Sequence, residues 1–217
     1  MKLYSSPGSP NALRSRAVLH QLGLPADIVT INIGGGENRT PEYLKLNPNG
    51  KVPTLVDDDL VIWESRAIDA YLASKKPEAN LYPDDPRRRA LIDQWSYWQA
   101  IHLGPSMQKI NFERVQKKGF GRGEPDESVL VGDIKTVAEL LGVLDGALAG
   151  KQWIAADLSI ADFALASTFM FRKSAKLGVE AFRSVTAWIE RLEATPGWQQ
   201  ALVPWRALMD QRGIPIG

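Results

Sequence analysis

The chain has 217 residues, which allows one large or two small domains, and its 44% apolar and 24% charged content is ordinary for a globular protein. A net charge of +1 argues against binding to nucleic acid or a membrane surface through bulk electrostatics. The absence of cysteine excludes disulfides and cysteine-based chemistry, and the two histidines, His20 and His102, have no carboxylate partner at metal-ligand spacing, so we expect no metal site.

Short strands and helices alternate in the first part of the chain. We expect strands at 2–5, 28–33, 54–56 and 60–63, a helix from the loop at 7–11 to the C-cap Gly23, and one helical turn at 41–46. A further helix at 65–73 is expected to face inward with Ala67, Ile68, Tyr71 and Leu72. This order predicts helices packed against a mixed four-stranded sheet.

The rest of the chain is predicted to be helical. Residues 75–86 contain three prolines and indicate a linker. After it, apolar residues recur every three or four positions at Leu91, Trp95, Trp98 and His102; at Leu130, Ile134, Val137, Leu141, Leu144 and Leu148; and at Val185, Trp188, Ile189 and Leu192. A last helix is expected at about 198–211. We therefore divide the chain into an α/β domain at 1–76, a linker at 77–86 and an all-helical domain at 87–217.

The segment from Asn47 to Leu55 reads Asn-Pro-Asn-Gly-Lys-Val-Pro-Thr-Leu. A turn at Pro48 and Gly50 leads into a Val-Pro dipeptide at the start of a strand. Pro53 has no N–H for a sheet ladder, and a proline that starts a strand after a turn is one of the few places where a cis peptide bond is plausible. Such a bond would turn the backbone of Val52 outward, with its N–H and C=O free for a peptide-like ligand.

Two further segments resemble helix starts. Glu64 and Ser65 precede an amphipathic run, and a helix N-terminus with a serine can bind a carboxylate through hydroxyl and N–H together, although Ser65 acting only as a cap stays open. Ser159 and Asp162 form an acidic variant of a capping box, flanked by Leu158 and Phe163, which stabilises a helix by about 1 kcal/mol.

These three motifs, in this order and spacing, resemble those of the cytosolic glutathione transferases over essentially the whole chain. The matching stretches are Asn47 to Leu55, Glu64-Ser65-Arg66-Ala67-Ile68 and Ser159-Ile160-Ala161-Asp162-Phe163. The resemblance implies a thioredoxin-like N-terminal domain followed by an all-helical C-terminal domain. It also implies glutathione as cosubstrate with no further cofactor, and a homodimer.

The same resemblance assigns residues to glutathione. Val52, before the cis-proline Pro53, would bind the cysteinyl backbone, and the Glu64-Ser65 pair would hold the γ-glutamyl end. Lys51 matches the position that reaches the glycyl end, and Asn38 and Arg39 fall where related enzymes place a second group for that carboxylate.

The catalytic group is expected in the loop after the first strand. In this family a hydroxyl there stabilises the glutathione thiolate, because a free thiol with a pKa of about 8.5 is mostly protonated at neutral pH. Ser9 resembles the serine of theta-, phi- and delta-like classes, and Asn11 could assist it. Ser5 and Ser6 remain alternatives, whereas the alternation of the strand favours a core role for Tyr4. The loop Ser9-Pro10-Asn11 also resembles that of bacterial nu-like members.

The second substrate site is implied near the first helices of the helical domain. Its candidate residues, which could equally belong to the core, are Trp98, His102, Met107 and Phe112. The expected activity is conjugation of glutathione to small hydrophobic electrophiles. Two alternatives stay open: glutathione-dependent reduction of disulfides or peroxides, and ligand binding without catalysis. The chain starts with Met1 to Ser5 and has no long apolar run there. It also has no stretch of the roughly 20 apolar residues that span a bilayer. We therefore expect a cytoplasmic protein without a membrane partner.

Overall fold

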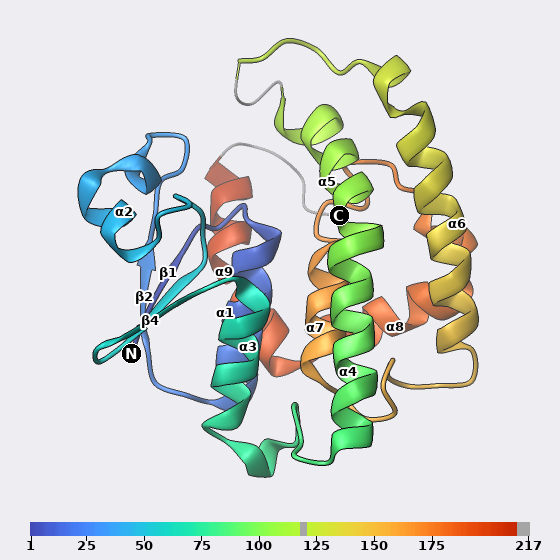
Figure 1. Cartoon of the computed structure of the whole chain (residues 1–217). Helices are drawn as coiled ribbons and strands as arrows, with labels where there is room; N and C mark the ends of the chain where they lie inside the picture. Colours follow the sequence, from blue (N-terminus) through green and yellow to red (C-terminus); the bar gives the residue numbers. More distant parts are fainter. Residues whose placement is uncertain (118–120, 212–217) are drawn as a thin grey trace. The chain divides into compact units, whose positions relative to one another are not determined.

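The computed structural model describes residues 1–117 and 121–211 (Figure 1). The chain divides into two compact units, one formed by Met1–Asp84 with the segment that begins at Glu193, the other by Asp85–Leu192. The end of the predicted helical domain, 212–217, lies outside the described residues. Within the described ranges, no helix combines the length and apolarity needed to cross a membrane.

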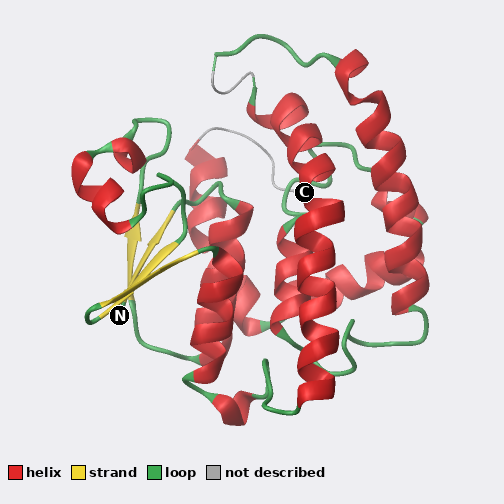
Figure 2. Ribbon diagram, in the orientation of Figure 1, coloured by secondary structure: helices red, strands yellow, loops and turns green. Residues whose placement is uncertain are grey.

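The first unit contains a mixed four-stranded sheet, as the sequence predicts (Figure 2). Its strands are β1 (Lys2–Ser5), β2 (Asp27–Thr30), β3 (Thr54–Asp57) and β4 (Leu60–Trp63), in the spatial order β2-β1-β3-β4. β1 pairs parallel with β2 and antiparallel with β3. The second strand is shorter than expected because the Asn32 N–H bonds to the Glu37 carboxylate at 2.7 Å, which turns the chain away from the sheet.

Four helices accompany this sheet (Figure 1). α1 (Pro10–Leu22) begins after its N-cap Ser9 and ends at Gly23, which adopts the left-handed conformation that glycine favours (φ 64°). α2 (Pro41–Leu46) and α3 (Ser65–Ser74) start where the sequence predicts. α9 (Pro196–Gln211) packs along α1, so it belongs to the compact unit of the sheet, although the sequence division placed it in the helical domain.

The inward face of α3 differs from the predicted one. Ala67 is exposed and Tyr71 is half-buried, because the Tyr71 hydroxyl donates to the Asp57 carboxylate at 2.6 Å at the edge of the sheet. Instead, Ile68 and Leu72 share the buried face with Asp69, whose side chain is 1% exposed. A polar residue therefore occupies a core position of this helix.

The second unit is helical throughout its regular elements. Its helices are α4 (Pro86–Trp98), α5 (Gly104–Asn111), α6 (Val131–Leu148), α7 (Ile160–Ser167) and α8 (Arg183–Glu193), with π-helical turns at Gln99–Leu103 and Phe112–Gln116. The predicted stripe on α6 is buried except for Ile134, and the four apolar residues of α8 are all buried. On α4 the buried residues are Ile92 and Ser96, so the stripe that contains Leu91 (48% exposed) marks a more exposed face.

The capping box at α7 is present as predicted. The Asp162 carboxylate accepts the Ser159 N–H at 2.9 Å, and it also accepts the Ile154 N–H and the Trp188 indole N–H. Burial raises the pKa of Asp162, while these donors lower it. The motif thus connects the start of α7 to α8 and has a structural role.

A close approach of two backbones holds α9 on α1. A Cβ atom built on Gly197 would lie 2.6 Å from the Gln21 nitrogen and 2.7 Å from the Ala17 oxygen, which are backbone atoms that cannot rotate away. Gly197→Ala is therefore expected to lower the free energy of unfolding by about 1–3 kcal/mol. Urea denaturation would measure the change.

Gly142→Ala in α6 is the matched control, because a Cβ there meets no atom within 4 Å. This substitution is expected to stabilise the helix by about 0.5–1 kcal/mol. Equal effects of the two substitutions would contradict the close-packing explanation for Gly197.

Candidate active site

The turn between α2 and β3 is fixed by hydrogen bonds to one carbonyl. The Lys51 oxygen accepts the Tyr43 hydroxyl at 2.7 Å and the Asn47 side-chain amide at 2.8 Å. Both donors also reach the Thr54 hydroxyl, at 3.0 and 3.1 Å. The next peptide bond, between Val52 and Pro53, is cis, as the sequence predicts.

The start of α3 supplies the second element of the site. Glu64 has φ 73° and ψ 111°, a conformation that non-glycine residues rarely adopt and that the surrounding structure must enforce. Glu64 is exposed, and Ser65, the first residue of the helix, is 5% exposed. Backbone N–H groups and the helix dipole at such an end favour an anionic ligand.

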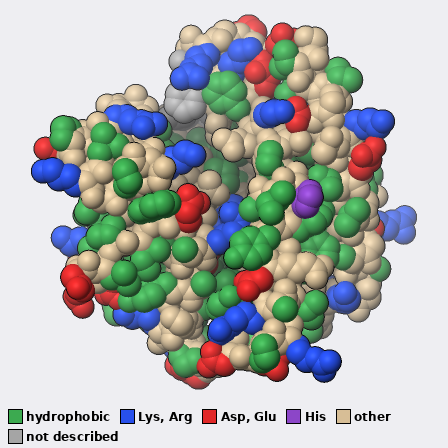
Figure 3. Space-filling model, viewed as in Figure 1, with side chains coloured by type: hydrophobic (Ala, Val, Ile, Leu, Met, Phe, Trp, Pro, Cys, Tyr) green, Lys and Arg blue, Asp and Glu red, His purple; other side chains and the backbone are tan. Residues whose placement is uncertain are grey.

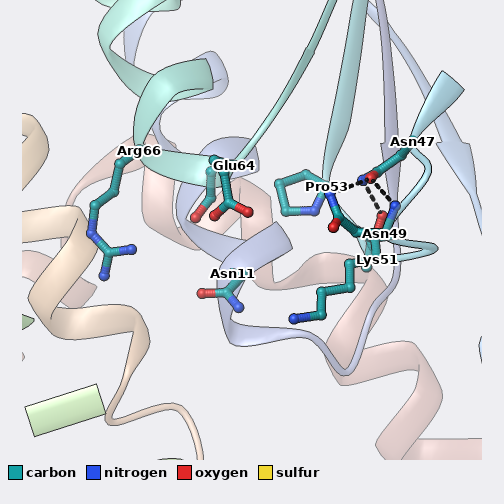
Figure 4. Close-up of a pocket in the computed structure, with 9 residues that line it drawn as sticks. Asn11, Asn47, Asn49, Lys51, Pro53, Glu64 and Arg66 are labelled. Atoms are coloured by element: carbon teal, nitrogen blue, oxygen red, sulfur yellow. Dashed lines mark hydrogen bonds between the residues drawn. The ribbon is translucent and has the colours of Figure 1, made fainter. Parts of the chain in front are cut away.

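These two elements and the start of α1 line one pocket, which lies within the first unit (Figure 4). Its lining residues are Asn11, Asn47, Asn49, Lys51, Val52, Pro53, Glu64, Ser65 and Arg66. Figure 4 shows the side chains of Asn11, Lys51 and Glu64 around the same space, with Arg66 extending from α3. The pocket thus combines a backbone edge, a cation, a carboxylate and a helix N-terminus.

Most of the predicted glutathione residues meet in this pocket, but Asn38 and Arg39 do not line it. Asn38 is 7% exposed and its amide donates to the Gly50 carbonyl at 2.7 Å. Arg39 donates to the Asn49 carbonyl at 3.4 Å. Both side chains therefore stabilise the turn through hydrogen bonds to its backbone carbonyls.

The loop after β1 presents its hydroxyls differently from one another. Ser5 is 2% exposed, and its oxygen accepts a hydrogen bond from the Arg16 guanidinium at 2.5 Å, so this hydroxyl is buried. Ser9 is half-buried and is not among the residues that line the pocket, and its oxygen accepts the Ala12 N–H at 3.3 Å as the N-cap of α1. Asn11, in the first turn of α1, is exposed and lines the pocket.

The predicted acceptor residues lie in the second unit and in different environments. The Trp98 ring is half-buried and lies 6.5 Å from the exposed His102 ring, centroid to centroid. Met107 is fully buried, whereas Phe112 is half-buried at the start of a π-helical turn. Met107 therefore belongs to the core of its unit, and Trp98, His102 and Phe112 retain accessible surface.

Three residues of the pocket were not among the predicted site residues: Asn47, Asn49 and Arg66. Their positions were within reach of sequence reasoning, since two of them flank Pro48 in the quoted turn and the third follows Ser65.

On the face in Figure 3, acidic and basic side chains are interspersed, and they do not form a continuous basic stripe there.

Buried charges lie directly behind the start of α3. The Asp69 carboxylate accepts the Ser15 hydroxyl at 2.6 Å, and the same hydroxyl lies 3.4 Å from the Ser65 carbonyl. Burial raises the pKa of Asp69 to about 7, against the opposing effects of Ser15 and Arg14. Burial also lowers the pKa of Arg14 to about 9. The network joins α1 to the helix that carries Ser65.

A thioredoxin-like unit with a cis-proline edge beside a helix N-terminus, joined to a helical unit, defines the class of protein. The chain matches the family models described as glutathione S-transferase, N-terminal domain, over residues 1–74, and glutathione S-transferase, C-terminal domain, over residues 99–196. It is 34% identical to glutathione S-transferase D7 of Drosophila melanogaster over 93% of this chain and 88% of that protein. The chain belongs to the glutathione S-transferase family.

Solved structures agree with this assignment. A glutathione S-transferase I from maize, in complex with an atrazine glutathione conjugate, superposes with a TM-score of 0.85 at 30% identity over 94% of this chain and 97% of that one. A glutathione transferase from Pseudomonas putida, with one glutathione disulfide bound per subunit, superposes with a TM-score of 0.84 at 28% identity over 93% and 90% of the two chains.

The buried carboxyl of Asp69 predicts a pH dependence of stability. An ordinary aspartate has a pKa of about 3.9, so the folded protein holds this proton more tightly than the unfolded chain does. The resulting stabilisation is fully present below about pH 4 and is lost as the pH rises through about 7. Asp69→Asn, which stays neutral, is expected to gain about 2–4 kcal/mol of unfolding free energy relative to the wild type between these limits.

Urea denaturation at a series of pH values would measure this difference. Asp58→Asn is the control, because Asp58 is exposed in the β3–β4 hairpin and its substitution leaves the interior unchanged. A difference between Asp69→Asn and the wild type that stays constant with pH would show that Asp69 is ionised throughout.

Proposed function

We propose that this chain transfers the thiolate of glutathione to small hydrophobic electrophiles. The observation that supports this most directly is the pocket in which Lys51, Val52 and the Glu64-Ser65 helix start come together. A γ-glutamyl tripeptide offers a complementary set of groups: an amide for the backbone edge and a carboxylate for each of the two cationic or dipolar ends.

Each part of the pocket then has a role toward glutathione. The Val52 backbone pairs with the cysteinyl amide, Ser65 binds the γ-glutamyl carboxylate, and Glu64 binds the amino group. Lys51 binds the glycyl carboxylate. Asn38 and Arg39 contribute through the turn, whose carbonyls they hold.

Ser9 is the proposed stabiliser of the thiolate. Its oxygen accepts the Ala12 N–H, so its own proton remains available to donate to sulfur. The Asn11 amide is a second donor from the same helix start, and Ser5 is disfavoured because its hydroxyl is buried, with Ser5 only 2% exposed. The thiolate then forms a bond to carbon, and the leaving group departs with its electron pair or, in an addition, the adjacent atom takes up a proton.

The loop Ser9-Pro10-Asn11 also supports assignment of the chain to a serine-type subclass, theta-, phi- or nu-like. A nu-like protein would catalyse a different reaction. There, glutathione would reduce a disulfide or a peroxide instead of attacking carbon. The glutathione disulfide in the Pseudomonas putida relative motivates this second candidate. Acceptor contacts are proposed from Trp98, His102 and Phe112, and the fully buried Met107 would act on them only through packing.

The roles of Ser9 and Asn11 are tested by alanine substitution. Loss of one preorganised donor to a developing anion costs about 10²- to 10³-fold in kcat, so we expect Ser9→Ala to fall in this range and to raise the pKa of the bound thiol. Asn11→Ala is expected to lose less. Turnover of a chromogenic aryl halide and the pH dependence of thiolate absorbance would measure both effects.

Ser6→Ala is the control in the same loop. Unchanged turnover and thiol pKa in Ser9→Ala would remove Ser9 from this role. Faster turnover of a hydroperoxide or mixed disulfide than of the aryl halide would favour the reductase candidate. Glutathione binding without turnover of any of these substrates would favour a ligand-binding protein.

We also propose that the protein is a homodimer located in the cytoplasm. The dimer is proposed from membership of the family, and both units carry exposed large apolar side chains that a second copy would cover, such as Trp63 (41% exposed) on β4 and Tyr97 (60% exposed) on α4. Light scattering after gel filtration is expected to give twice the chain mass of 24.0 kDa. A mass of one chain at micromolar concentration would contradict the dimer.

A further inference from the structure

Arg16 is a buried cation behind the loop that follows β1. Its side chain is 1% exposed. Its Nε donates to the Ala201 carbonyl of α9 at 3.1 Å, and its Nη1 donates to the Ser5 hydroxyl at 2.5 Å and the Ser6 carbonyl at 3.1 Å. Its Nη2 is buried and has no hydrogen-bond partner among the described residues.

This guanidinium also lacks a counterion among the residues that the structure describes. None of their carboxylates forms an ion pair with Arg16, and burial is the cause of its lowered pKa, about 10. The neighbouring Arg14 differs, because Asp69 and Glu64 act on it electrostatically. Burial lowers the pKa of His20, and the positive charge of Arg16 lowers it further. A buried charge without a counterion is costly even when it donates hydrogen bonds, so an anion that binds nearby would offset this cost.

The contacts of Arg16 lead to the proposed thiolate site. The Ser6 carbonyl that accepts from Arg16 also accepts the Ser9 N–H at 3.2 Å. One carbonyl therefore ties the guanidinium to the residue whose hydroxyl would face the sulfur. In surroundings of low dielectric, a positive charge acts over more than one hydrogen bond.

α9 supports the same loop from a second position. A Cβ on Gly8 would lie 3.5 Å from the Trp205 ring, so the aromatic side chain of this helix lies against the loop. Together with the Ala201 carbonyl, it places the last described helix directly behind Ser5 to Ser9.

We propose that Arg16 is a positioning residue of the thiolate site: it holds the loop that carries Ser9 and supplies the buried positive charge that the bound glutathione thiolate neutralises. This role rests on the proposed function. It adds a distant electrostatic contribution to thiol ionisation and connects α9 to the reacting sulfur through Arg16 and the Ser6 carbonyl.

The test compares neutral and charged replacements. Arg16→Gln removes the charge, and Arg16→Met does so without a new buried amide, so it serves where the glutamine variant does not fold. Both are expected to raise the pKa of the bound glutathione thiol by about one unit, with a roughly tenfold loss of kcat at mildly acid pH that recovers at alkaline pH. Arg16→Lys is expected to keep the thiol pKa near that of the wild type.

Two controls separate this role from a packing effect. S-methylglutathione has no ionisable thiol, so its affinity is expected to change less than about threefold in all three variants. Gln21→Met removes another contact between α1 and α9, the 3.1 Å bond from the Gly197 N–H, and is expected to lower Tm without moving the thiol pKa.

The proposal would be overturned by a thiol pKa in Arg16→Gln and Arg16→Met equal to that of the wild type. It would also be overturned by an equal pKa shift in Gln21→Met, since helix packing would then be the cause. A wild-type chain that fails to bind glutathione would refute the proposed function itself, whereas a lowered wild-type thiol pKa that persists in both neutral variants refutes only the role of Arg16.

Discussion

The Lys51 carbonyl is the point on which the ligand-binding edge depends. Two side chains with little exposure, Tyr43 and Asn47, donate to it. Asn47 also donates to the Thr54 hydroxyl at the start of β3, and that hydroxyl donates in turn to the Tyr43 oxygen. Burial raises the pKa of Tyr43, so its hydroxyl stays a donor. Val52, the residue that follows this carbonyl, lines the pocket. Loss of one donor leaves the other on this carbonyl, so it removes one hydrogen bond with a net contribution of about 0.5–1.5 kcal/mol.

The same unit contains buried charged side chains on the helices that line the pocket. Arg14, Arg16 and Asp69 are each no more than 2% exposed, and each lies on a helix, α1 or α3, that contributes to the pocket. Moving charges out of water costs free energy that apolar side chains at these positions would not incur. The arrangement therefore favours an electrostatic use, because fixed charges in a medium of low dielectric act strongly on an anion bound at the adjoining helix ends.

The sequence predicts a residue's structural role well when that role depends on local backbone conformation. It predicts the role poorly when the role depends on contacts with residues that are distant in sequence. Gly23 and the Val52–Pro53 bond have conformations set by local chemistry, and both were predicted at the correct positions, whereas the N-cap role of Ser9 was not predicted. Asp69 was missed and Ala67 was misplaced because the apolar period of α3 hides a polar residue whose partner, Ser15, is distant in sequence. The packing of α9 on α1 depends on a backbone contact at Gly197, which periodicity cannot reveal.

The helical segment that carries the candidate acceptor residues is harder to predict for a related reason. Helical periodicity assumes a constant 3.6 residues per turn, whereas the π-helical turn at Gln99–Leu103 inserts an extra residue and rotates the faces that follow it. The turn requires Gly104, since a Cβ there would lie 2.8 Å from the Gln99 carbonyl. His102 and Met107 fall on either side of this glycine, and one is exposed while the other is fully buried. The glycine therefore marks the change of helical face in this segment, which the aromatic spacing before it does not reveal.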